Sequence, residues 1–165
     1  MLERRSINFA AFLVCAALIG YALYAQFYLG LIPCPLCVFS RVAVMAMGVA
    51  FLLAGLFNPR GGGRWVTSGL IGLTSLAAIG VSIRHVYIQA QPPGSVPACG
   101  APLDVLMQMF KVWTVVYKVF HGGGECAEVN WRFLGLAMSA WVLVFAVVLG
   151  AIGVWVNRPS RKSAG

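Results

Sequence analysis

Two cysteines, Cys34 and Cys37, are the residues of this sequence best suited to chemistry. They stand three positions apart in the run Pro33-Cys34-Pro35-Leu36-Cys37, and an apolar helix is expected to begin near Pro35. Cysteines at this spacing can close a small disulfide, and the partial positive charge of a helix N-terminus stabilises a thiolate. The run therefore predicts a redox-active pair at the start of a helix.

Arg41 follows Cys37 by four residues, a spacing that puts its guanidinium on the same helix face as the thiol. At about 1.5 Å per residue, it would lie roughly 9 Å inside the helix start. A charged side chain this deep in an apolar helix is costly unless it serves a purpose. We expect Arg41 to stabilise an anion; the alternative is that its long side chain reaches back to the lipid headgroups.

A second pair, Cys99 and Cys126, lies 27 positions apart in segments rich in glycine and proline. Such segments suit a disulfide that must meet different partners in turn. Two alternatives stay open: a structural disulfide, which stabilises a loop of this length by about 3–4 kcal/mol, and a zinc site built from all four cysteines. A c-type haem site is excluded, because Val38 and not histidine follows Cys37.

The other candidates are single residues. Cys15 lies inside an apolar stretch, where we expect a small buried hydrophobe. His85 ends another apolar stretch and either hydrogen-bonds a ligand or anchors that stretch at the membrane interface. His121 is expected to be solvated. Because the sequence has two histidines and neither lies well inside an apolar stretch, a bis-histidine haem is not expected.

The elements that must position these residues are membrane-spanning helices. Hydrophobic residues make up 61% of the chain and charged residues 10%, whereas a soluble domain is roughly 25% charged. Four apolar stretches approach or exceed the about 20 residues that a span needs, namely residues 7–32, 35–57, 65–84 and 133–156. The predicted fold class is an all-α integral membrane protein, a four-transmembrane-helix bundle in one domain over residues 1–165. We expect small residues to close it: Gly69, Gly72 and Gly80.

Basic residues set the predicted orientation, because lysine and arginine concentrate near span ends on the cytoplasmic side. They precede the first span, occupy the turn after the second and follow the fourth: Arg4, Arg5, Arg60, Arg64, Arg158, Arg161 and Lys162. Both termini are therefore predicted to be cytoplasmic. The short loop 31–40 and the long loop 86–132 would lie on the opposite, outer side and hold Cys34, Cys37, Cys99 and Cys126, in a periplasm-like compartment where disulfides persist. The net charge of +8 reflects topology and contact with anionic lipids, with no sign of nucleic-acid binding.

Within the long loop, the segment from Leu103 to Phe120 is apolar enough to suggest a fifth span. Its polar residues recur at three- and four-residue steps and so form one stripe: Asp104, Gln108, Lys111, Thr114 and Lys118. This pattern predicts an amphipathic helix that lies on the membrane interface. A fifth span would also put Cys99 and Cys126 on opposite sides of the membrane.

Together these features resemble the DsbB family of bacterial disulfide bond formation proteins. The resemblance rests on four spans, on a Cys-x-x-Cys that opens the second with Arg41 four residues on, and on a cysteine pair in a long outer loop. It extends to Gly-Glu-Cys-Ala-Glu followed by Trp-Arg-Phe-Leu-Gly-Leu, and covers nearly the whole chain. One departure is Ser40, at a position where some members carry an acid.

The resemblance implies a thiol:quinone oxidoreductase of the bacterial inner membrane. A periplasmic thioredoxin-fold oxidase, DsbA-like, would attack the disulfide between Cys99 and Cys126 and form its mixed disulfide on Cys99. Cys126 would then attack Cys34 and release the Cys37 thiolate beside Arg41.

Electrons would pass from Cys37 to ubiquinone or menaquinone. Arg41 and His85 would lie at the quinone, and no metal is expected.

Two other functions remain as alternatives. A vitamin K epoxide reductase-like enzyme also joins four spans, loop cysteines and a quinone, but in that family the membrane Cys-x-x-Cys follows the loop pair, whereas here it precedes it. The second alternative is a non-catalytic membrane protein whose cysteines are structural or bind metal. Stable metal content, or disulfides inert to a reduced partner, would favour it.

Overall fold

Four long helices form the body of the protein. The computed structural model describes residues 2–31, 33–59, 61–91, 107–121 and 132–158. The long helices are α1 (Leu2–Phe27), α2 (Pro35–Phe57), α3 (Gly63–Gln89) and α6 (Met138–Asn157), and a shorter helix, α5, covers Val112–His121. All four long helices are apolar and long enough to cross a membrane. The predicted four-helix membrane bundle is therefore confirmed.

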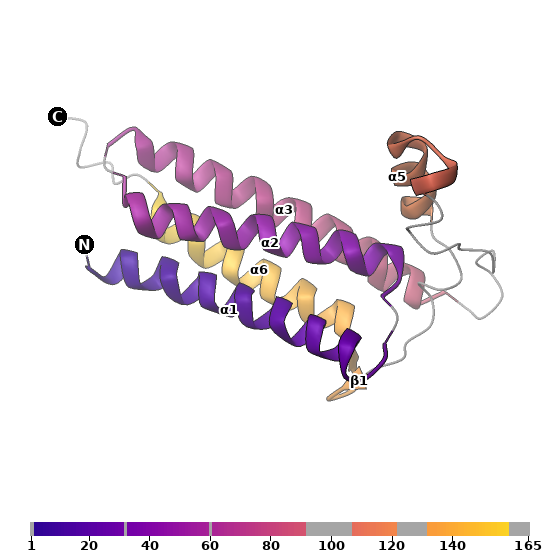
Figure 1. Cartoon of the computed structure of the whole chain (residues 1–165). Helices are drawn as coiled ribbons and strands as arrows, with labels where there is room; N and C mark the ends of the chain where they lie inside the picture. The colour runs from indigo at the N-terminus through magenta and orange to yellow at the C-terminus, as the bar shows by residue number, and fades with distance from the viewer. Residues whose placement is uncertain (1, 32, 60, 92–106, 122–131, 159–165) are drawn as a thin grey trace.

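The long helices lie side by side, and their ends sort into two groups (Figure 1). The start of α1, the end of α6 and the turn between α2 and α3 lie at one end of the bundle, and α5 lies at the other. Helix α1 packs on α2, α2 on α3, and α3 on α6, while α1 also touches α6. The start of α2, where Cys34 and Cys37 lie, therefore shares an end with α5.

Two of the predicted helix boundaries were wrong because the backbone turns before the predicted end of α1 and after the predicted start of α6. Helix α1 ends at Phe27 and not at residue 32, because Gly30 adopts a left-handed φ of 66° and the Leu31 amide donates back to Ala25 O at 3.2 Å. Helix α6 begins at Met138 and not at residue 133. The preceding residues form a hairpin of β1 (Arg132–Phe133) and β2 (Leu136–Ala137), whose turn places Leu134 and Gly135 at φ 51° and 80°.

The remaining differences in the spans have another cause. Helix α1 begins at Leu2 rather than residue 7, and α3 runs from Gly63 to Gln89 rather than from 65 to 84. Hydropathy locates the apolar part of a helix, whereas the hydrogen-bonded backbone continues into the polar residues on either side. As a result His85, predicted at the end of the third span, lies within α3, which ends at Gln89.

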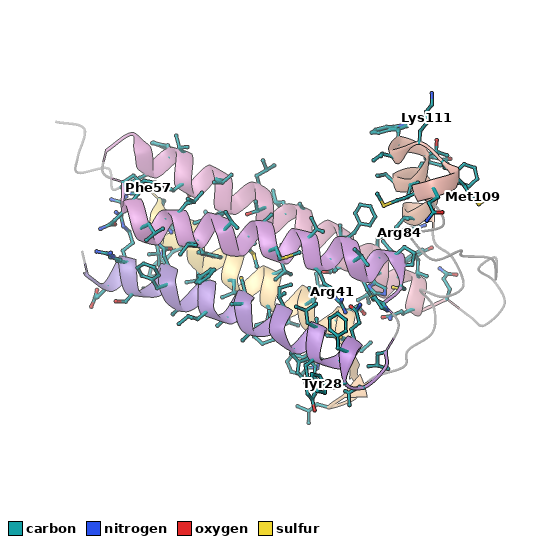
Figure 2. The ribbon with its side chains drawn as sticks, in the orientation of Figure 1. Tyr28, Arg41, Phe57, Arg84, Met109 and Lys111 are labelled. Atoms are coloured by element: carbon teal, nitrogen blue, oxygen red, sulfur yellow. The ribbon has the colours of Figure 1, made fainter. Side chains whose placement is uncertain are left out.

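The amphipathic helix predicted over residues 103–120 is not continuous. The helix is broken at Phe110 and Lys111, and α5 begins at Val112. Periodicity did not reveal the break, because a helix interrupted in the middle can keep polar residues on one face of each half. Within α5, Val115 and Val119 are buried, whereas Trp113 is 83% exposed and Lys111, just before the helix, points away from the bundle (Figure 2).

Glycines of α6 lie where the long helices leave no room for a side chain. A Cβ atom at Gly153 would lie 2.6 Å from the ring of Phe51 and 2.8 Å from Ile71, and one at Gly150 would lie 2.7 Å from Ser75. Phe51 and Ile71 are fully buried, so neither can move aside easily. The glycines of α6 therefore let it reach α2 and α3.

The glycines predicted to close the bundle do not do so. A Cβ atom would meet nothing within 4 Å at Gly69 or Gly80, and only Val154, at 3.5 Å, at Gly72. Sequence spacing does not show which face of an apolar helix meets a neighbouring helix and which meets lipid.

A polar cluster holds the bundle at the end opposite the cysteines. Asn8 of α1 and Asn157 of α6 are buried and exchange two hydrogen bonds, of 3.1 and 2.9 Å. Nearby, the Arg4 guanidinium donates to Asn58 Oδ1 and to Pro59 O, each at 2.9 Å. Interhelical hydrogen bonds in a membrane contribute about 0.6–2 kcal/mol each, so these contacts fasten α1 to the rest of the bundle.

The Gly153→Ala variant tests the close packing of α6. The added methyl group must displace a buried phenyl ring, so the free energy of unfolding should fall by about 1–3 kcal/mol. The matched Gly80→Ala variant adds the same methyl group where it meets nothing, and should change that free energy by less than about 1 kcal/mol, in the stabilising direction. Unfolding in mixed detergent and SDS micelles measures both. An equal loss in the two variants would contradict this packing.

Candidate redox site

Cys34 is the N-cap of α2. Its backbone is extended, with φ −67° and ψ 160°, and its Sγ accepts a hydrogen bond from the Cys37 amide at 3.2 Å. Pro35 occupies the first helical position, where its missing N–H costs nothing. The sulfur thus takes the place of the serine or aspartate oxygen that usually caps a helix. The predicted position of the cysteine pair, at the start of a helix near Pro35, is confirmed.

The two sulfurs are close enough to react with each other. Cys34 Sγ donates to Cys37 Sγ at 2.9 Å, and no disulfide joins these two cysteines in the structure. Disulfide sulfurs are about 2.05 Å apart, so a small side-chain rotation would close the bond. Cys34 is buried and Cys37 half-buried. The pair therefore has the separation that reversible oxidation requires.

His85 of α3 lies beside this pair. Its Nε2 is 3.6 Å from Cys34 Sγ, and the residue is 3% exposed. The same Nε2 is 3.5 Å from the amide nitrogen of Gln89, whose Oε1 accepts a hydrogen bond from Ser139 Oγ of α6. With the Gln89 amide assigned in this way, His85 Nε2 accepts and Nδ1 carries the proton. Polar contacts thus link His85 of α3 through Gln89 to Ser139 of α6, and the ring of His85 lies against Cys34.

Three buried polar atoms around the pair lack a hydrogen-bond partner among the described residues: His85 Nδ1, Ser40 Oγ and Ser82 Oγ. Ser40 lies one turn after Cys37 on α2, and Ser82 one turn before His85 on α3. Most buried polar groups are hydrogen-bonded, and each orphan costs about 1–3 kcal/mol. Several unsatisfied polar atoms close to one another are typical of a site that binds a polar ligand.

Arg41 is directed at α1 and not at the thiols. Its guanidinium donates to Gln26 Oε1 and, at 3.1 Å, to the carbonyl oxygen of Ala22. Figure 2 shows Arg41 near the end of the bundle that carries Tyr28 and far from Phe57. The shared face of Arg41 and Cys37 was predicted from α2 alone, and the polar Gln26 on α1 provides an acceptor that this prediction left out.

An apolar cluster covers the pair. It joins Cys34 to residues of α2, α3 and α5, namely Leu36, Val81, Ile88, Val115 and Val119, with Cys37 and Phe39 packed against it. Low polarity strengthens electrostatic interactions inside the site. Helix α5 therefore acts as a cover over Cys34.

The structure brings together three of the six predicted site residues, Cys34, Cys37 and His85. Their ligand atoms all lie within 4.8 Å of one another, as a metal site requires. Cys99 and Cys126 lie outside the described residues, and so does the side chain of His121.

Cys15 is a buried core residue, as predicted. Sequence reasoning missed Gln89 and Ser139; the spacing of Gln89, four residues after His85, places it on the same helix face.

Comparison with known proteins identifies the family of this chain. The family model described as Disulfide bond formation protein DsbB matches residues 4–156. The Disulfide bond formation protein B of Chromobacterium violaceum is 49% identical over 148 residues, which cover 90% of this chain and 89% of that protein. That of Nitrosococcus oceani is 44% identical over 164 residues, covering 99% and 97%. The chain therefore belongs to the DsbB family of disulfide bond formation proteins.

Proposed function

We propose that this membrane protein re-oxidises a DsbA-like dithiol protein and passes the electrons through its two cysteine pairs to a membrane quinone. The observation that carries the proposal is the pair itself: two sulfurs 2.9 Å apart at the N-terminus of α2, with the buried His85 3.6 Å from Cys34. Membership of the DsbB family favours this function over the vitamin K epoxide reductase-like alternative.

The proposed cycle is a series of thiol–disulfide exchanges followed by one two-electron oxidation. The reduced partner attacks the disulfide of Cys99 and Cys126, becomes oxidised, and leaves both as thiols. These two thiols then reduce the disulfide of Cys34 and Cys37. Oxidation of the second pair releases two electrons and two protons and restores its disulfide.

Cys37 is the proposed exit for the electrons. It is more exposed than Cys34, and its sulfur accepts a hydrogen bond from the Cys34 thiol. In the reduced pair, that hydrogen bond and the positive end of the helix both favour negative charge on Cys37. When the Cys34–Cys37 disulfide is attacked at Cys34, no thiol proton is present there, and the helix end stabilises the leaving Cys37 thiolate. Cys37 is therefore suited to be the leaving thiolate when Cys34 is attacked.

The unsatisfied polar atoms fit a quinone. His85 Nδ1–H and the hydroxyl groups of Ser40 and Ser82 are donors that lack acceptors among the described residues, and quinone carbonyls are acceptors. A bound ubiquinone or menaquinone would take up the two electrons and two protons. We further propose that Arg41 serves as a fixed positive charge at the quinone, held in place by Gln26 and Ala22.

The proposed orientation puts the cysteine end of the bundle in the periplasm. Arg4, Arg64 and Arg158 interact at the opposite end, where Arg4 binds Asn58 and Arg64 donates to the carbonyl of Arg158. Lysine and arginine near span ends favour the cytoplasmic side of the bacterial inner membrane. The partner and the disulfides would then meet in an oxidising compartment.

Quinone reduction tests the cycle. With a reduced DsbA-like protein and the purified chain in detergent, ubiquinone or menaquinone absorbance should fall with time. Cys37→Ala should reduce that rate to background, because the proposed exit thiolate is gone. The control variant Cys15→Ala alters a cysteine of the core and should leave the rate of quinone reduction unchanged. Failure of the wild-type protein with both quinones would refute the relay.

Steady-state kinetics test the role of Arg41. Removing its charge in Arg41→Gln should raise KM for quinone about tenfold, which corresponds to about 1.4 kcal/mol. Oxidation of the partner in the absence of quinone should keep its rate, since that step uses the cysteines alone. Arg84→Gln, which removes an arginine that lies over Tyr87, is the matched control. An unchanged KM in Arg41→Gln would exclude the proposed role.

Labelling of intact cells tests the orientation. In a background with Cys34, Cys37, Cys99 and Cys126 replaced by serine, a membrane-impermeant maleimide should modify Trp113→Cys on α5, whose native side chain is 83% exposed. Trp65→Cys, at a position 70% exposed near the other end, should be modified only after lysis. The reverse pattern would invert the proposed orientation.

A further inference from the structure

The reduced cysteine pair and His85 have the geometry of three ligands of a tetrahedral metal. Zn–S and Zn–N distances of about 2.3 and 2.0–2.1 Å imply edges of roughly 3.8 Å between two sulfurs and roughly 3.6 Å between sulfur and nitrogen. Cys34 Sγ and His85 Nε2 are 3.6 Å apart, and the two sulfurs are 2.9 Å apart. Of the three edges, the one between Cys34 and His85 already fits, and the one between the sulfurs must lengthen by about 0.9 Å. The third, between Cys37 and His85, is no longer than 4.8 Å.

The ligand types and their supports also suit a metal. Thiolate and imidazole are the ligands that Zn²⁺ prefers, whereas Mg²⁺ and Ca²⁺ prefer oxygen. Cys34 and Cys37 belong to the first turn of α2 and His85 to α3, so all three are carried by regular elements. The contact from the Gln89 amide, at 3.5 Å, favours the tautomer in which His85 Nε2 carries the lone pair, and a bound metal would replace the amide as its partner.

Charge explains why zinc fits an apolar site. Two thiolates and one Zn²⁺ sum to zero, and a neutral group costs far less to bury than an isolated ion. The cluster around Cys34 is apolar, with Leu36 and Ile88 nearly inaccessible to solvent. Two thiols become thiolates as the metal binds, so two protons leave for each ion.

We infer that Cys34, Cys37 and His85 form a Zn²⁺ site in the reduced protein, and that closing the disulfide destroys it. Three protein ligands leave a fourth position for water, as in zinc sites that exchange ligands. The metal and the disulfide compete for the same two sulfurs. Given the proposed function, bound Zn²⁺ would hold the pair reduced and stop electron transfer to quinone; the binding itself does not depend on that function.

Metal titration tests the site. The full-length chain with Cys99→Ser and Cys126→Ser, which leaves Cys34 and Cys37 as the pair, is reduced in detergent and titrated with Zn²⁺ against a chromogenic chelator. We expect one ion per chain, and none after the pair is oxidised. Cys15→Ala should bind as before. Because the oxidised and reduced forms share one sequence, this comparison does not depend on the folding of a variant.

The histidines supply the second comparison. His85→Ala should weaken Zn²⁺ affinity at least tenfold, while His121→Ala should leave it unchanged. Absorbance of the Cd²⁺–thiolate bond in the same variants reports the sulfur ligands separately. Absence of binding to the reduced chain, or full affinity in His85→Ala, would overturn the site. If the metal-free wild-type protein fails to reduce quinone, that result would contradict the proposed function. It would not contradict the Zn²⁺ site, which the titration tests separately.

Discussion

The hydrogen bond from the Cys37 amide to Cys34 Sγ is the contact on which the candidate site depends. It makes the reactive sulfur part of the helix end, so that the first turn of α2 and the redox pair are one structure. A cap with an oxygen acceptor contributes about 1 kcal/mol, and the weaker sulfur acceptor contributes less. Movement of Cys34 toward an attacking thiol would remove the cap, and the exchange chemistry is thereby coupled to the local stability of α2.

The contacts that stabilise the bundle lie at one end, and the groups suited to redox chemistry lie at the other. At one end Asn8 and Asn157 satisfy each other, and Gly153 lets α6 pack against Phe51. At the other end His85 Nδ1 and two serine hydroxyls lie buried without partners in the described part of the chain. Unsatisfied groups are tolerated where the remaining structure supplies the free energy that holds them in place. The hydrogen bonds between Asn8 and Asn157 and the close helix packing at the far end supply that free energy.

The sequence alone predicted the features that depend on one helix at a time. The four spans, the start of α2 at Pro35 and the burial of Cys15 follow from hydropathy and from local spacing. The features that the sequence did not predict depend on how two helices meet. The bonds from Arg41 to α1 require knowledge of which helices are neighbours, and the approach of Gly153 to Phe51 depends on which face of α6 turns inward.

The burial of Cys34 sets two requirements against each other. A sulfur that exchanges disulfides must be reached by another thiol, yet Cys34 is only 8% exposed and packs in a cluster with Val115 and Val119 of α5. The electron transfer proposed for the neighbouring Cys37, in contrast, would benefit from a site that excludes water. A cover that packs through a few valine side chains can be displaced at small cost. In the proposed relay, displacement of α5 would open Cys34 to Cys126, and its return would enclose the reduced pair before the proposed electron transfer from Cys37.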